Sequence, residues 1–129
     1  MAALLIEADI RTKIRKGDKV TRGIDHVVIA VNDIKKAREI YEKMGFKVTP
    51  KALHPFGTEN SLVQLNGNFI EIVGVDNLSL VPPHTKEKYS FAQANVDFLS
   101  YKEGMSSLVF QSLDCLLYTS DAADDLVGV

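Results

Sequence analysis

The chain has 129 residues, of which 46% are hydrophobic and 25% are charged, so its composition is that of one ordinary globular domain. The formal net charge of −2 and the scattered basic residues argue against nucleic-acid binding. No segment is apolar over the roughly 20 residues of a membrane span, and we expect a cytoplasmic protein. A single cysteine, Cys115, excludes an internal disulfide and a multi-cysteine metal site.

The first regular elements are predicted after residues 1–21, which we interpret as an N-terminal extension. Residues 24–31 are rich in β-branched side chains, a composition typical of a buried strand. A polar pair that can cap a helix follows, and apolar residues then recur at helical spacing. The sequence therefore predicts a helix over 33–44, which Gly45 terminates.

The rest of the chain predicts strands, one hairpin and a second helix. Asn66-Gly67 separates two β-rich runs, and this pair favours a two-residue hairpin turn because both positions adopt positive φ. Prolines and a glycine ahead of the hairpin predict a loop. The expected elements are a strand over 46–48, a loop over 49–60, strands over 61–65 and 69–75, a helix over 86–102 and a strand over 105–111.

A faint internal repeat links residues 23–33 to residues 104–114. The glycine, two central apolar positions and the final aspartate match without a gap. We therefore interpret residues 22–103 as a first module with its connecting helix, and residues 104–114 as the start of a second module.

Residues 115–129 need a separate interpretation. The codons of a transposon-end sequence used in preparing DNA sequencing libraries encode residues 115–124 without a mismatch. We expect the segment to be read-through from such DNA and to lack a defined packing partner. On this hypothesis the natural sequence ends near Leu113 or Asp114.

Four blocks of sequence occur in the order and spacing of a known family. They are GIDHVVIAVND over 23–33, YEKMGF over 41–46, HPFGTEN over 54–60 and FIEIV over 69–73. Together they resemble the glyoxalase-like domain family of the vicinal oxygen chelate (VOC) superfamily. The resemblance implies an α+β fold of βαβββ modules, two of which form a cup-shaped sheet. The superfamily includes isomerases, epimerases, ring-cleaving dioxygenases and drug-binding resistance proteins, so fold alone does not define function.

The resemblance assigns two candidate metal ligands. In metal-dependent members, a histidine on a module's first strand and a glutamate on its last strand point into the cup, and the matching residues are His26 and Glu71. Their nitrogen and oxygen ligands suit Zn, Fe, Mn or Ni. Ser107 matches the second-module histidine and is a poor ligand, which argues against a metal. A hydrogen-bonded histidine and a solvated glutamate are the alternative interpretation.

Further candidates for chemistry follow from the same resemblance. Glu71 is the candidate catalytic carboxylate, because it could move a proton as well as ligate a metal. His54, Thr58 and Asn60 lie in a stretch that resembles the family's His-Pro…Gly-Thr-x-Asn loop, and they are the candidate substrate-binding residues. Turn geometry at a strand end is the alternative explanation for this loop.

Two functions remain open at this point, beside a third class in which the chain is a purely structural half-domain of a larger protein. The preferred hypothesis is the amino-terminal part of a glyoxalase-like small-molecule enzyme, in which a divalent metal chelates neighbouring substrate oxygens in a lyase, isomerase or dioxygenase reaction. The alternative is a metal-free module that sequesters a small molecule such as a drug. The expected partners are a small-molecule substrate and either a second βαβββ module or a second copy of the chain.

Side-chain alternation predicts where the candidate ligands point. The apolar face of the first strand should cover the helix, which sends His26 to the opposite face. Ile70 and Ile72 should take the helix side of the last strand, which sends Glu71 into the cup with His26. We also expect the apolar residues of the cup to have few partners in this chain: Ile24, Val28, Phe69 and Val73.

Overall fold

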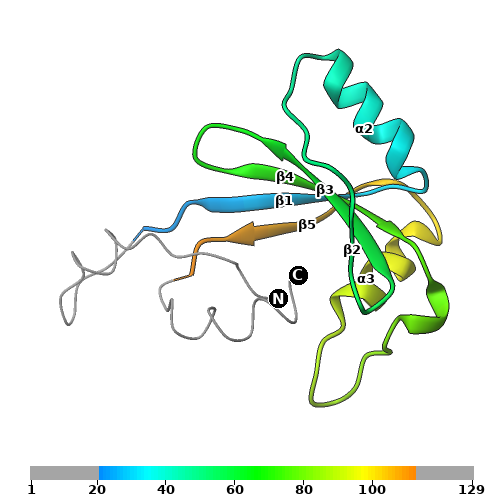
Figure 1. Cartoon of the computed structure of the whole chain (residues 1–129). Coiled ribbons are helices and arrows are strands. Elements are labelled where there is room, and N and C mark those ends of the chain that lie inside the picture. Colours follow the sequence, from blue (N-terminus) through cyan, green and yellow to red (C-terminus); the bar gives the residue numbers. More distant parts are fainter. Residues whose placement is uncertain (1–20, 113–129) are drawn as a thin grey trace.

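A mixed five-stranded sheet organises the part of the chain that the computed structural model describes, residues 21–112 (Figure 1). The interpretations of residues 1–20 and 115–129 concern segments outside the described residues. The α+β class and the βαβββ order are confirmed. The elements are β1 (Ile24–Ala30), α2 (Ile34–Lys43), β2 (Ala52–Leu53), β3 (Thr58–Gln64), β4 (Phe69–Val75), the 3₁₀ helix η1 (Leu78–Leu80), α3 (Phe91–Leu99) and β5 (Gly104–Phe110).

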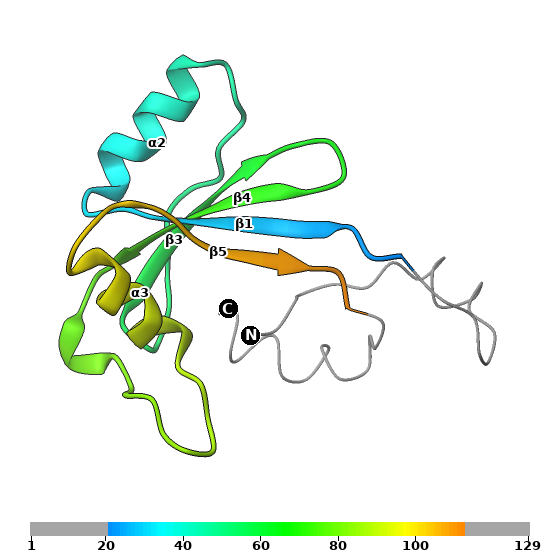
Figure 2. The same ribbon diagram turned by 180° about the vertical axis from the view of Figure 1, so that it is seen from behind.

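The strand order is β2-β3-β4-β1-β5, so the first and last strands of the module are neighbours (Figure 2). β1 runs parallel to β4, and the other pairs are antiparallel. Asn66-Gly67 forms the expected turn between β3 and β4, with Gly67 at φ 85°. This topology places the side chains of β1 and β4 within reach of one another.

The helix α2 packs on one face of the sheet as its sequence predicts. Its N-cap, Asp33, accepts a hydrogen bond from the Lys36 backbone amide at 3.0 Å, and Gly45 follows its end at φ 96°. One hydrophobic cluster lies between helix and sheet, and it includes both isoleucines assigned to this side of β4. Its members are Val31, Ile34, Val63 and Ile72, with Ile29, Ala37, Tyr41, Val48 and Ile70 packed against them.

Three element boundaries differ from the prediction. Residues 46–48 contribute only an isolated bridge, from Val48 to Val63, and the expected loop contains β2 and the start of β3. The second helix begins at Phe91 rather than near residue 86. Ser90 sets this start, because its hydroxyl accepts the Gln93 backbone amide at 3.0 Å.

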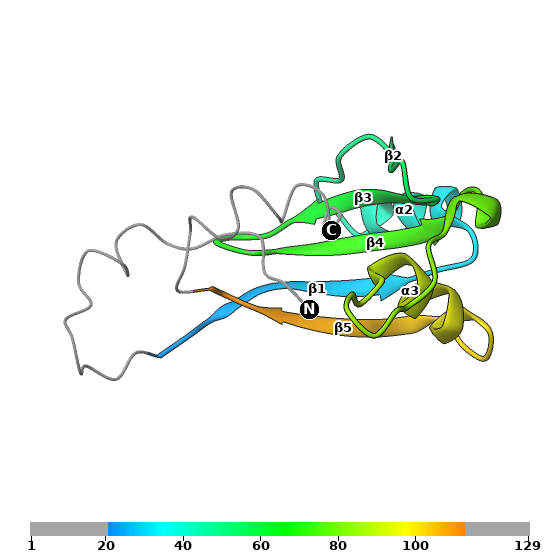
Figure 3. The same ribbon diagram turned by 90° about the horizontal axis from the view of Figure 1, so that it is seen from below.

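The helix α3 covers part of the opposite face, so the expected exposure of that face is only partly correct (Figure 3). Val28 and Val73 are fully buried and pack with Phe91 of α3, Val109 of β5 and the half-buried Phe56. Ile24 remains 42% exposed. We call this side of the sheet, which carries Val28 and Val73, the cup face.

The helices of residues 21–112 are all too short or too polar to cross a membrane.

Candidate functional site

His26 and Glu71 lie together on the cup face, on neighbouring strands, as side-chain alternation predicts. In the β1–β4 ladder His26 is opposite Phe69, and Val28 is opposite Glu71. His26 Nε2 is 3.4 Å from Glu71 Oε1, and the two side chains are almost completely buried. The Phe69 ring stacks on the imidazole with centroids 4.6 Å apart, which restrains the plane of the His26 ring.

A β-bulge brings a third buried side chain to this site. Ile24 pairs with Phe110 and His26 pairs with Val109, so Asp25 is an extra residue on β1 against β5. The extra residue interrupts the alternation of side chains. Asp25 Oδ2 therefore reaches His26 Nδ1 at 2.8 Å, although the two residues are adjacent in sequence.

Each of the two central groups is anchored through one polar atom and unpartnered at the other. His26 donates from Nδ1 to Asp25, because a carboxylate oxygen can only accept. Glu71 Oε2 accepts a 2.8 Å hydrogen bond from Asn60 Nδ2. His26 Nε2 and Glu71 Oε1 have no hydrogen-bond partner, and they face each other. Two facing acceptors in a buried site require a cation or a proton between them.

The carboxylates raise the pKa of His26. Burial by itself lowers this pKa, but the hydrogen bond to Asp25, the close contact with Glu71 and the negative charges of both carboxylates outweigh it, so the net pKa lies above the ordinary 6.5. A proton is therefore one possible occupant of the space between Nε2 and Oε1.

This shift gives an expected pH dependence of stability in the metal-free chain. A raised folded-state pKa stabilises the fold below the unfolded value, and this stabilisation is lost as pH rises through the raised value. We expect Glu71→Gln to reduce this pH-dependent stabilisation. Between about pH 6 and pH 8.5 the free energy of unfolding should therefore fall more in the wild type than in this variant. Urea unfolding in EDTA measures the difference. Equal losses in both proteins would contradict the pairing of His26 with Glu71.

A metal ion is the other possible occupant, and the spacing fits one. Two ligands of a tetrahedral ion at about 2.0–2.2 Å stand about 3.3–3.6 Å apart. The 3.4 Å between Nε2 and Oε1 falls in this range. Among residues 21–112, however, no group of three or more His, Cys, Asp or Glu side chains is placed to hold a metal. The described residues therefore supply at most two ligands of these four types.

The three candidate substrate-binding residues are only partly brought together. His54 Nδ1 and the fully buried Thr58 hydroxyl lie 2.7 Å apart, and Asn60 instead bonds to Glu71. Burial lowers the pKa of His54 below 6.5, and the charge of Glu71 opposes part of that shift. His54 is thus neutral at pH 7, and Glu71 lies near enough to act on both His54 and His26.

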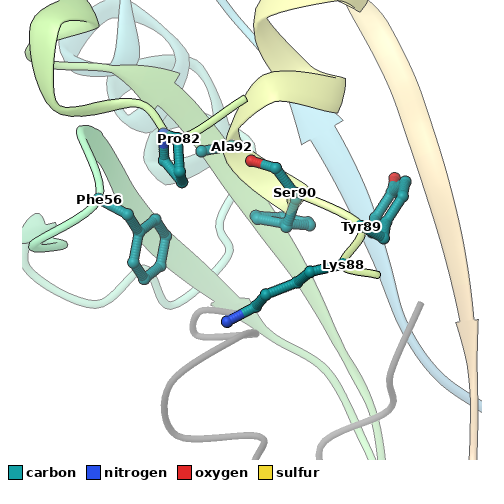
Figure 4. A pocket seen from close by; sticks show the side chains of 7 residues that line it. Phe56, Pro82, Lys88, Tyr89, Ser90 and Ala92 are labelled. Atoms are coloured by element: carbon teal, nitrogen blue, oxygen red, sulfur yellow. The ribbon is translucent and has the colours of Figure 1, made fainter. Parts of the chain in front are cut away.

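A small pocket of about 110 Å³ adjoins the His54 loop (Figure 4). Phe56 lines it and also stacks on the His54 ring, with centroids 4.9 Å apart. The other lining residues come from the segment before α3 and its first turn: Pro82, Lys88, Tyr89, Ser90, Phe91 and Ala92.

Gly57 holds the loop that carries His54 and Thr58. It adopts φ 91°, and its carbonyl accepts backbone hydrogen bonds from Asp76 and Asn77. A Cβ here would collide with the Asn77 carbonyl oxygen and approach Val81 Cγ2 to 2.8 Å. We expect Gly57→Ala to cost more than about 2 kcal/mol in the free energy of unfolding, from combined φ strain and overlap.

Gly67→Ala is the matched control, because Gly67 has φ 85° but no atom within 4 Å of the added Cβ. Its cost should be only the conformational strain of about 1 kcal/mol. Equal destabilisation of both variants in urea unfolding would show that contacts at Gly57 do not matter.

Asn60 is expected to stabilise the Glu71 carboxylate. Asn60→Ala removes the donor to Oε2 and leaves a buried carboxylate oxygen unsatisfied. We expect a loss of about 1–3 kcal/mol in unfolding free energy. The control is Asn68→Ala on the exposed hairpin turn, which should change stability far less. An unchanged stability of Asn60→Ala would mean that water replaces the amide without cost.

Sequence reasoning missed Asp25 as part of the site. The alternation of side chains places it on the face away from His26, and a bulge has no signature in a two-residue period. The adjacent Asp-His pair was the available signal. Ser107, which the repeat aligns with His26, lies on the cup face of β5 opposite Val28.

Solved structures with a similar fold include methylmalonyl-CoA epimerases and hypothetical proteins. Methylmalonyl-CoA epimerase from Mycobacterium tuberculosis shares 21% identity at a TM-score of 0.56, over 78% of this chain and 62% of that one. The Streptomyces coelicolor methylmalonyl-CoA epimerase, in complex with 2-nitronate-propionyl-CoA, shares 22% identity at a TM-score of 0.50, over 79% of this chain and 68% of that one. A hypothetical protein from Staphylococcus aureus shares 19% identity at a TM-score of 0.60, over 80% of this chain and 41% of that one.

These identities establish the fold alone. The chain spans about three fifths of the length of the M. tuberculosis epimerase. No curated protein matches the chain.

The family model of the glyoxalase-like domain matches residues 24–124. This match covers most of the chain, and the βαβββ module agrees with it. The protein therefore belongs to the glyoxalase-like domain family.

Proposed function

We propose that this chain supplies half of a divalent-metal site in a small-molecule enzyme of the VOC type. The observation that carries the proposal is the pair of unpartnered, buried atoms, His26 Nε2 and Glu71 Oε1, which face each other at 3.4 Å. Natural sequences rarely retain facing buried acceptors unless a ligand satisfies them. With two ligands from this module, the remaining coordination positions fall to water, substrate or a second module.

The chain's own residues have distinct roles in this proposal. His26 and Glu71 hold the ion, and Asn60 holds Glu71 through its other oxygen. When bound, a divalent metal acts as a Lewis acid on two neighbouring substrate oxygens. The acidic substrate C–H bond would lie near Glu71 or His54, the two proton-accepting groups that are electrostatically coupled here.

The pocket beside Phe56 is the proposed place for the rest of the substrate. It adjoins the His54 loop and is lined by aromatic and aliphatic side chains with one lysine (Figure 4). Such a mixture suits a small molecule with an apolar part and an acidic part. We therefore propose small oxygenated acids as the substrate class.

The experiment is a two-stage assay on the 129-residue chain. Calorimetry with Zn²⁺, Mn²⁺, Ni²⁺ and Fe²⁺ should show one ion per chain. Proton NMR in D₂O should then show metal-dependent deuterium exchange at the acidic carbon, which is C2 of 2-hydroxy acids and C3 of 2-oxo acids. Binding without exchange would restrict the proposal to the metal site, and absence of any ion binding would overturn it.

A metal-free binding module is the second candidate, and two observations favour it. Ser107 takes the position where the resemblance expects a histidine. In addition, the raised pKa of His26 allows the protonated imidazole to bridge the carboxylates of Asp25 and Glu71 without metal. Small-molecule binding that EDTA does not affect would support this candidate.

We also propose that β5 begins a second module or an interface with a second copy. β5 is an edge strand of the described sheet, and Met105 and Phe110 are 58% and 52% exposed. An exposed apolar edge strand usually pairs with another chain or module.

A further inference from the structure

The proposed function uses His26 and Glu71 but leaves a third buried group without a role. Asp25 is 7% exposed, and its carboxylate contacts the imidazole rather than solvent. Burying a carboxylate is costly unless its charge is compensated. Regular alternation would direct the side chain at position 25 to the apolar α2 side, where a buried carboxylate is particularly costly.

The β-bulge resolves this conflict and directs Asp25 to His26. The pairing of β1 with β5 slips by one residue between Ile24 and His26, so Asp25 has no paired residue on β5. Bulges occur preferentially beside functional sites, where they change the direction of a side chain. The result is a 2.8 Å contact between neighbouring residues of a strand, which regular alternation does not allow.

The two contacts of the imidazole differ in quality, and this difference decides where its proton lies. Nδ1 to Asp25 Oδ2 is 2.8 Å and satisfies hydrogen-bond geometry, whereas Nε2 to Glu71 Oε1 is 3.4 Å and does not. In the neutral ring the proton therefore resides on Nδ1. The lone pair on Nε2 is left facing Glu71.

We propose that Asp25 is a positioning residue, which fixes the tautomer and orientation of His26 so that the Nε2 lone pair faces Glu71. The inference rests on the proposed function for its purpose, because a carboxylate behind a ligating histidine orients the ring and increases its basicity. The tautomer itself can be measured without any metal. Phe69 restrains the ring plane but cannot select between the two nitrogens.

The test compares the wild type with Asp25→Ala, Asp25→Asn and the exposed control Asp76→Asn. Long-range ¹H–¹⁵N NMR in EDTA, at a pH above the His26 titration, reports which ring nitrogen carries the proton. We expect Nδ1–H in the wild type and the control, and loss of that preference in Asp25→Ala. The Asn oxygen still accepts a hydrogen bond, so Asp25→Asn should restore Nδ1–H. Circular dichroism verifies that each variant folds. If Asp25→Ala does not fold, the near-isosteric Asp25→Asn variant still tests whether an accepting oxygen at position 25 keeps the proton on Nδ1.

Zn²⁺ calorimetry provides the second readout. Loss of such an outer partner weakens metal binding by about 10–100-fold. We therefore expect the Zn²⁺ affinity to fall by this factor in Asp25→Ala and by a smaller factor in Asp25→Asn. Nε2–H in the wild type, or an unchanged Nδ1–H in Asp25→Ala, would overturn the inference. If the wild type binds no Zn²⁺ but shows an Asp25-dependent tautomer, the proposed function fails while the positioning role stands.

Discussion

His26→Gln and Glu71→Gln are each expected to abolish measurable binding of divalent metal. Both changes keep nearly the volume of the side chain but replace a good ligand by an amide. Because the described residues offer two ligands at most, either change leaves only one. The affinity for divalent metal should fall by more than about 100-fold, which is the largest effect typical of removing an outer partner.

Calorimetry with Zn²⁺ measures this loss, and two exposed positions give matched controls. His84→Gln and Glu87→Gln remove the same chemical groups at exposed positions of the segment before α3. We expect both controls to retain wild-type affinity. If the His26 and Glu71 variants bind Zn²⁺ as tightly as the wild type, the ion sits elsewhere and the proposed site is wrong.

Ser107→His is expected to increase Zn²⁺ affinity at least about tenfold, equivalent to about 1.4 kcal/mol. Ser107 is opposite Val28, and Val28 is opposite Glu71, so the three lie in one row across β5, β1 and β4. Paired residues on adjacent strands point to the same face. An imidazole at this half-buried position would add a third protein ligand, the number typical of catalytic zinc sites.

Ser107→Ala is the control for this gain, since it changes the same position without adding a ligand. Its affinity should match the wild type. A folded Ser107→His protein with unchanged affinity would show that position 107 cannot reach the ion, and would remove the link between the sequence repeat and the site.

The sequence predicts the elements whose signals are local. α2 follows from its cap, its apolar spacing and Gly45, and the hairpin follows from Asn66-Gly67. The placement of His26 and Glu71 follows from alternation, because both strands keep a regular parallel ladder between these positions. Periodicity is sufficient where the ladder is regular.

The missed features depend on contacts between distant segments. α3 starts at Phe91 because Ser90 caps it, and Phe91 covers Val28 and Val73. Such coverage cannot be read from the composition of the strand that it buries. Asp25 joins the site through a slip in the pairing with β5, a strand about 80 residues away in sequence. Ser90 and the adjacent Asp25-His26 pair are local signals, but neither one predicts the coverage by Phe91 or the slip in strand pairing.

Anomalous diffraction at the zinc edge, from crystals of the chain grown with Zn²⁺, tests the central claim most directly. We expect one anomalous peak on the cup face, at about 2.0–2.2 Å from His26 Nε2 and from Glu71 Oε1, with Asp25 still bonded to Nδ1. A cup face without a peak, in crystals where His26 and Glu71 keep their 3.4 Å contact, would contradict the metal site and favour a bridging proton.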